Sequence, residues 1–157
     1  MRGMLVLICL FFVSPANAGY DSAYTDFDLG KCREIEPAPN EGEGSATYEC
    51  PGYNGIPVTF AEGDLRAFVA FGKDGRKHCA FRQTFGGFNN VSSKIEWRLK
   101  DGKPIATIFR WSESYDGEDA SKQRTWLVVT KLANGNSCQM GYVEGAFPKA
   151  NEKARWL

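Results

Sequence analysis

The clearest hydrophobic pattern in the chain is a strict alternation over residues 94–100. The apolar positions are Ile95, Trp97 and Leu99, and a charged side chain stands on either side of each one. A period of two predicts a half-buried strand of an antiparallel sheet. Asp101-Gly102 follows directly and is typical of a two-residue hairpin turn, so we expect a return strand over residues 105–111.

Shorter apolar and β-branched runs predict further strands. They cover residues 46–50, 56–61, 65–71, 78–84, 124–132 and 137–143. In the run 65–71, the residues expected on the buried face are Leu65, Ala67, Val69 and Phe71. Asn134-Gly135 predicts a second hairpin turn, and residues 148–156 predict a short C-terminal helix. We therefore expect a mainly β fold, an antiparallel β-barrel or sandwich of about eight strands.

The first eighteen residues are typical of a secretory signal peptide. Arg2 precedes an apolar run over residues 4–13, and Ala16-Asn17-Ala18 matches a cleavage site before Gly19. The run has about half of the roughly 20 residues that a membrane-spanning helix needs, although an uncleaved anchor stays open as an alternative. We predict one exported domain over residues 19–157, periplasmic or secreted, with no transmembrane segment after cleavage.

Four cysteines remain after the predicted cleavage, and an even number in an exported chain indicates two disulfides. They are Cys32, Cys50, Cys79 and Cys138. Pairing of neighbours along the chain, 32 with 50 and 79 with 138, is favoured because local pairs close first. The crossed pairing of 50 with 138 and 32 with 79 stays open. Zinc-knuckle spacing is missing and His78 is the single histidine, so we expect no metal site.

Charge is segregated along the chain although its net value is zero. Residues 19–64 carry ten acidic and two basic side chains, and residues 65–111 carry three acidic and ten basic ones. Neutralisation by packing of the two segments is the simpler interpretation. The other is a basic face that meets an anionic envelope polymer or an acidic partner. The balanced total argues against nucleic-acid binding.

Motifs for catalysis are weak. His78 adjoins a cysteine that is expected to be oxidised, and G-x-S-x-G and phosphate-cradling loops are missing from the sequence. We predict no catalytic residue and no cofactor. Acidic residues near 116–119 present oxygen ligands, but they lack the alternation of a calcium loop. A carboxylate-based envelope hydrolase stays open; it requires two carboxyl groups about 5–9.5 Å apart in a cleft.

Two tryptophans flank this acidic loop and suggest a binding end of the sheet. Trp111 and Trp126 form an aromatic platform in this hypothesis, with Asp116 and Asp119 as polar partners. Core packing is the competing interpretation for each ring, as it is for Trp97.

Three segments resemble a family of small exported proteins of alphaproteobacteria that has no assigned function. They are residues 95–99, 103–111 and 137–143, and the resemblance covers most of residues 48–157. It implies a periplasmic or secreted location. Residues 48–50 also show a weaker similarity to periplasmic inhibitors of c-type lysozyme, which are small disulfide-closed β-barrels. The inhibitory Ser-Gly-x-x-Tyr loop of those inhibitors has no counterpart here, so no inhibitory residue is carried over.

The leading hypothesis is an exported, non-enzymatic binding or envelope-associated protein, whose partner is an envelope polymer or another protein. A lysozyme-inhibitor-like protein and a carboxylate-based hydrolase are the alternatives.

Overall fold

The computed structural model describes residues 19–38, 46–116 and 121–157. The expected signal peptide, residues 1–18, lies outside the described residues. One sheet contains β1 (Tyr20–Asp26), β6 (Asn89–Lys100), β7 (Lys103–Ser114), β8 (Gln123–Ala133) and β9 (Asn136–Glu144), hydrogen-bonded in that order. The other contains β2 (Arg33–Glu36), β3 (Thr47–Cys50), β4 (Val58–Gly63) and β5 (Arg66–Phe71). Short 3-10 turns are η1 (Leu29–Lys31), η2 (Tyr53–Gly55), η3 (Gly75–Lys77) and η4 (Cys79–Arg82), and α1 (Ala150–Ala154) ends the chain.

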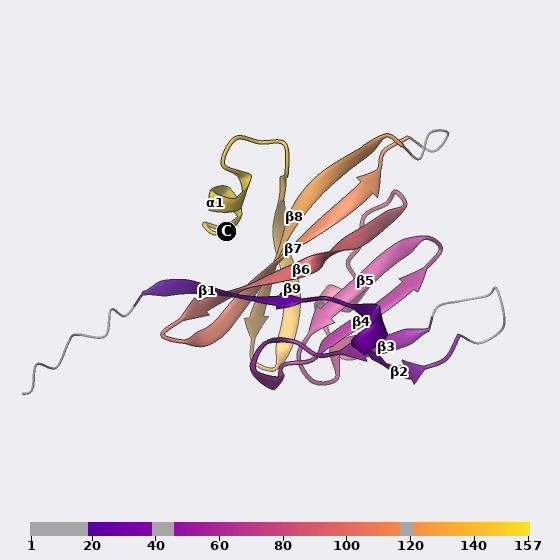
Figure 1. Cartoon of the computed structure of the whole chain (residues 1–157), viewed down its shortest axis with the longest axis horizontal. Helices are drawn as coiled ribbons and strands as arrows, with labels where there is room; N and C mark the ends of the chain where they lie inside the picture. Colours follow the sequence, from indigo (N-terminus) through magenta and orange to yellow (C-terminus); the bar gives the residue numbers. More distant parts are fainter. Residues whose placement is uncertain (1–18, 39–45, 117–120) are drawn as a thin grey trace, which may run out of the picture.

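Both sheets are antiparallel, and the main core lies between them (Figure 1). The mainly β class and the short C-terminal helix are confirmed, but the sheets are not closed into a barrel. The described residues form nine strands where about eight were expected. No helix among the described residues has the length and apolar character that crossing a membrane requires.

The alternating segment behaves as its pattern predicts. Ile95 and Trp97 are fully buried in β6 and Leu99 is 6% exposed, all within the core between the sheets. Asp101 and Gly102 have φ values of 51° and 75°, the left-handed pair that a tight hairpin turn needs. Period and turn chemistry therefore agree on this hairpin, and the structure confirms it.

The predicted strand over residues 78–84 is wrong. This segment forms 3-10 turns that are attached to the sheet by side chains instead of a strand ladder. Gln83 and Gln139 exchange three hydrogen bonds of 2.8–3.3 Å. Leu65 was also misplaced: it is 60% exposed and has a φ of 55°, because it belongs to the turn between β4 and β5.

Both disulfides form with the favoured pairing. Cys32 bonds to Cys50, joining the segment after η1 to the end of β3. Cys79 bonds to Cys138, joining η4 to β9 across a sequence separation of 59. The second bond therefore links the irregular segment after β5 to the five-stranded sheet.

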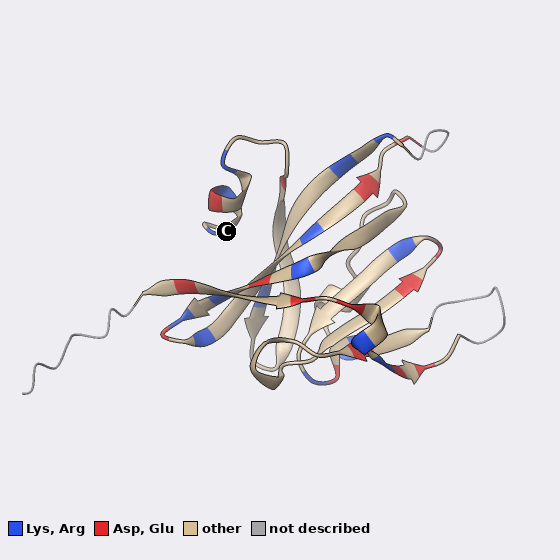
Figure 2. Ribbon diagram, in the orientation of Figure 1, with Lys and Arg blue, Asp and Glu red and all other residues tan. Residues whose placement is uncertain are grey.

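Ion pairs join the acidic first segment to the basic middle segment. Lys94 Nζ lies 2.6 Å from Asp26 Oδ1, and Arg76 Nη1 lies 2.5 Å from Glu36 Oε2. The hydrogen bond and the charge of Lys94 lower the pKa of Asp26 below its usual value. Acidic and basic residues are interspersed over both sheets (Figure 2). These contacts favour neutralisation over one continuous basic face.

Thr107 leads to a stability prediction. It is fully buried opposite Trp97, and its Oγ1 has no hydrogen-bond partner within the described part of the chain. A buried hydroxyl without a partner is destabilising, so Thr107→Val is expected to raise the free energy of unfolding by about 1 kcal/mol. Urea denaturation measures the change.

Thr25→Val is the matched control for this substitution. Thr25 Oγ1 accepts a 2.8 Å hydrogen bond from Trp97 Nε1, so removing its hydroxyl leaves that donor unsatisfied and destabilises the protein. A loss of stability in Thr107→Val similar to that in Thr25→Val would contradict the assignment of an unpartnered hydroxyl at position 107.

Candidate functional site

A serine–histidine pair is present but lies inside the protein. His78 Nδ1 is 3.0 Å from Ser137 Oγ, within the distance expected of a nucleophile and its base. The two residues are 4% and 1% exposed, and Ser137 Oγ also accepts a hydrogen bond from the Phe71 backbone N–H. The pair connects the segment before η4 to β5 and β9, next to the Cys79–Cys138 disulfide. This geometry supports a structural role for His78.

Of the four residues predicted to bind a ligand, the three that the structure describes differ in how deeply they are buried. Trp111 is 1% exposed and lies in the core, which matches the core-packing interpretation for this ring. Trp126 is only half-buried and lies opposite it on the neighbouring strand. Asp116 forms an ion pair with Lys122, with Oδ2 and Nζ 2.7 Å apart, and Asp119 lies outside the described residues.

Trp126 belongs to an aromatic cluster that reaches the surface. We define this aromatic cluster as Phe85, Trp111, Trp126 and Tyr142. Phe85 stacks on Trp126 at 5.7 Å between ring centroids, and Tyr142 meets the edge of Trp126 at 5.0 Å. Tyr142 is 56% exposed, so the cluster extends from the core to solvent. An exposed tyrosine backed by packed rings is a rigid amphipathic contact surface.

Glu113 determines how the Trp126 ring is held. Trp126 Nε1 donates a 2.8 Å hydrogen bond to Glu113 Oε2, and the Gly87 N–H approaches the other carboxylate oxygen at 3.4 Å. A Cβ at Gly87 would lie 2.3 Å from the Ser114 carbonyl oxygen, so only glycine permits this approach of the loop. The indole is thereby oriented from β7 and from the loop before β6.

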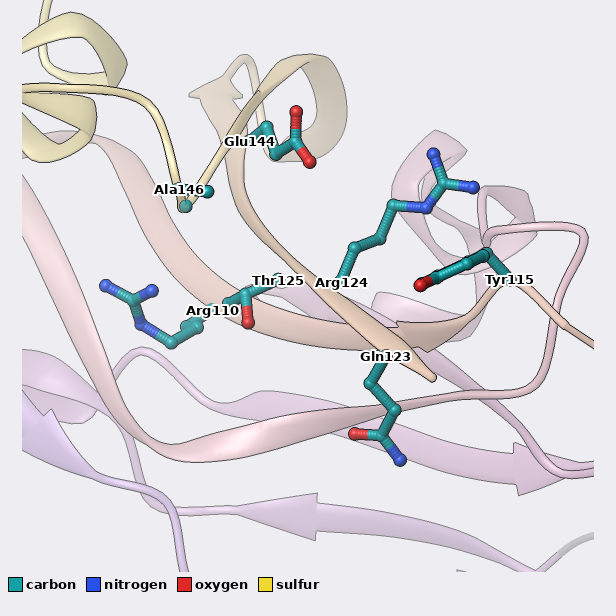
Figure 3. A pocket seen from close by; sticks show the side chains of 8 residues that line it. Arg110, Tyr115, Gln123, Arg124, Thr125, Glu144 and Ala146 are labelled. Carbon is teal, nitrogen blue, oxygen red and sulfur yellow. The ribbon is translucent and has the colours of Figure 1, made fainter. Parts of the chain in front are cut away.

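A pocket lies beside this cluster, between the last residue of β9, Glu144, and the first residues of β8 (Figure 3). We call it the arginine pocket; its volume is about 620 Å³. Its lining residues are Arg110, Tyr115, Gln123, Arg124, Thr125, Glu144, Gly145 and Ala146. The Gly145 N–H donates to the Thr125 carbonyl at 2.6 Å, which holds the chain against β8 directly after β9 ends. A Cβ at Gly145 would lie 3.0 Å from Arg110 Nη1, so glycine leaves room for that guanidinium.

Two guanidinium groups give the arginine pocket its charge. The Arg124 guanidinium carbon lies 4.8 Å from the ring centroid of Tyr115 and 5.7 Å from that of Trp126, cation–π contacts that position the side chain. In Figure 3, the Arg110 guanidinium lies on one side of Thr125 and the Arg124 side chain lies on the other. Neither arginine forms an ion pair with a described residue, and Glu144 is the single carboxylate among the lining residues. The pocket therefore favours anionic groups over cationic ones.

Carboxylates are scarce in the described lining of the arginine pocket. Within residues 19–38, 46–116 and 121–157, no group of three or more His, Cys, Asp or Glu is placed to hold a metal ion. The arginine pocket offers one carboxylate from its described lining, whereas a glycosidase uses two. The arrangement suits recognition of a ligand by stacking and by charge.

The sequence predicted Trp126 as a binding residue but not the residues that surround it. A signal for Arg124 was present, because residues two apart in a strand share a face, so Arg124 and Trp126 lie side by side. Phe85 and Tyr142 come from distant segments, and no local pattern links them to Trp126. No protein-family model, curated protein or solved structure matches this chain.

Proposed function

We propose that this protein is an exported, non-enzymatic binding protein and that its ligand is an acidic glycan. The observation that carries the proposal is the juxtaposition of the aromatic cluster with the arginine pocket. Tyr142 and Tyr115 are 56% and 54% exposed, and Arg124 links the two features by its contacts with Tyr115 and Trp126. Aromatic rings pack against the apolar faces of sugar rings, and guanidinium groups donate hydrogen bonds to carboxylates.

The arginines account for the preference for an acidic ligand. Guanidinium groups bind carboxylates through two parallel hydrogen bonds, a geometry that lysine does not offer. Arg110 is exposed and unpaired among the described side chains, so binding a carboxylate there breaks no existing ion pair. Arg124 is held by ring contacts, so less side-chain entropy is lost when it binds.

Export is supported by two features. Residues 1–18 have the layout of a signal peptide, and four cysteines form two disulfides, which persist in oxidising compartments. We therefore propose a periplasmic or secreted location, where acidic polymers of the cell envelope are accessible.

Titration calorimetry with oligogalacturonate tests this proposal, and the methyl ester of the same oligomer is the uncharged comparison. We expect binding of the acid that weakens as salt is added, and affinity for the ester that is at least about tenfold lower. Arg110→Gln and Arg124→Gln are each expected to weaken binding of the acid about tenfold, because each removes a charged hydrogen-bond donor.

Arg33→Gln is the matched control, because Arg33 is an exposed arginine of the other sheet that pairs with Glu49 at 3.0 Å. Its affinity for the acid should equal that of the unchanged protein. Equal affinity for acid and ester, no binding of either, or unchanged affinity in both pocket variants would each overturn the proposal.

A further inference from the structure

The C-terminal segment covers part of the five-stranded sheet on the face opposite the four-stranded sheet (Figure 1). Ala150 and Ala154 of α1 pack there against Ile108, Leu127 and Val129. The chain then continues to Trp156 and Leu157, which are 90% and 62% exposed. Two adjacent apolar side chains are therefore exposed to solvent next to a packed apolar face.

Arg155 holds this segment on the sheet. Its Nε and one terminal nitrogen contact the two oxygens of Glu96 at 2.6 and 3.1 Å, and the same nitrogen donates to Tyr24 Oη at 3.1 Å. Glu96 is 7% exposed and also accepts a 2.6 Å hydrogen bond from Ser22 Oγ. Burial raises the pKa of Glu96, but the hydrogen bonds from Arg155 and Ser22 and the charges of Arg155 and Arg98 together lower it below its usual value. The ionised Arg155–Glu96 pair therefore holds the C-terminal segment in place, so that this segment forms a wall beside the sheet.

A groove of about 640 Å³ lies between this wall and the sheet. We call it the C-terminal groove. Its apolar lining includes Ile105, Val129, Leu132, Met140, Trp156 and Leu157. The volume falls within the range of about 300–1,000 Å³ that is common for small-molecule sites. Met140 is 57% exposed although it lines the groove, so an apolar occupant would remove it from water.

The cationic residues that line the groove differ in whether a carboxylate already pairs with them. Arg98, Lys131 and Arg155 line it, against Glu152 as the acidic lining residue among those described. Arg155 and Arg98 both lie near Glu96, with Nε–Oε1 and Nη1–Oε1 distances of 2.6 and 3.8 Å. Lys131 forms no ion pair with any residue that the structure describes, so its ammonium group is available to an anion. An apolar slot with an available cation is complementary to a chain that ends in a carboxylate.

We propose that the C-terminal groove binds a long-chain fatty acid, with the acyl chain between Met140 and Trp156 and the carboxylate at Lys131. This site is distinct from the arginine pocket and does not depend on the proposed glycan. A slot walled by the C-terminal segment suits one flexible chain better than a flat protein surface. The occupant is therefore a monomeric amphiphile, and it takes the place of water against the exposed apolar side chains.

Titration with palmitate below its micellar concentration tests the proposal on the disulfide-bonded protein. One palmitate per chain is expected, with a blue shift of the Trp156 emission that is lost in Trp156→Phe. Laurate, which is four methylene groups shorter, should bind at least about tenfold more weakly, because each buried methylene contributes to affinity. Hexadecanol should also bind more weakly because it lacks the charge that Lys131 pairs with.

Variants locate the site. Met140→Asp is expected to weaken palmitate binding at least tenfold and Lys131→Gln severalfold, because the first places a charge in the groove and the second removes the cation. Leu29→Asp is the matched control, since Leu29 is a 45% exposed apolar residue of η1 outside the groove. Its affinity for palmitate should be unchanged.

Three results would overturn the proposal. The first is equal affinity for palmitate in Met140→Asp and in the unchanged protein. The second is binding to lipid vesicles without binding to monomeric palmitate. The third is a dimer in sedimentation velocity that Met140→Asp dissociates while palmitate does not bind, because the groove would then be an interface between two copies.

Discussion

Replacing Trp97 with alanine is expected to lower the free energy of unfolding by about 4 kcal/mol. The side chain is fully buried, and its ring centroid lies 5.5 Å from that of Phe71 and 6.1 Å from that of Tyr53. The substitution removes this packing from the centre of the core and takes the donor away from Thr25. Guanidinium denaturation followed by far-ultraviolet circular dichroism measures the loss.

Trp156→Ala is the control for this substitution, because it removes the same side chain from a position that is 90% exposed. Its free energy of unfolding should stay within about 0.5 kcal/mol of that of the unchanged protein. Similar losses in the two variants would show that Trp97 is not a central core residue.

Removal of the Cys79–Cys138 disulfide by a double substitution to alanine is expected to cost about 4 kcal/mol in the chain-entropy model. The bond closes a long loop, with a sequence separation of 59, so its loss frees much of the unfolded chain. Equilibrium denaturation of the double variant gives the change.

The Cys32–Cys50 bond provides the comparison. Its sequence separation is 18, so the same substitution there should cost less, about 3 kcal/mol. A larger loss at the shorter loop, or full stability without the longer one, would contradict the role given to the longer disulfide.

Local sequence patterns predicted the hairpins correctly where the alternation of apolar residues and the turn residues pointed to the same structure. The hairpin of β6 and β7 combines strict alternation with Asp101-Gly102, and the hairpin of β8 and β9 turns at Asn134-Gly135, where φ is 53° and 69°. The disulfide pairing followed from proximity along the chain. These features need no information from distant segments, and for this reason the sequence predicted them.

Features that depend on tertiary contacts were missed. β1 contains few apolar residues, and its strand conformation depends on pairing with β6 over Tyr20–Asp26. Glu96 was expected on the polar face of its strand, yet it is buried because Arg155, distant in sequence, covers it. The segment after β5 looked like a strand, but the disulfide and the Gln83–Gln139 hydrogen bonds hold it as turns.

In the candidate site, too, the sequence predicted a feature of local origin and missed those that depend on tertiary contacts. Trp126 was chosen because it flanks a polar loop, and it does lie at a surface cluster. Trp111 was chosen for the same reason, but its face of β7 meets the core. The sequence placed neither Phe85 nor Tyr142 beside Trp126, because contacts among three separated segments leave no periodic signal.

The indole N–H resonances in a 1H–15N spectrum, recorded during a titration with oligogalacturonate, give the most direct test of the proposed glycan site. The Trp126 ring contacts Arg124, which lines the arginine pocket, whereas the Trp97 ring lies in the core and donates a hydrogen bond to Thr25. We predict a saturable shift of the Trp126 indole resonance and an unchanged Trp97 resonance. Saturable binding that leaves the Trp126 resonance in place would contradict the account.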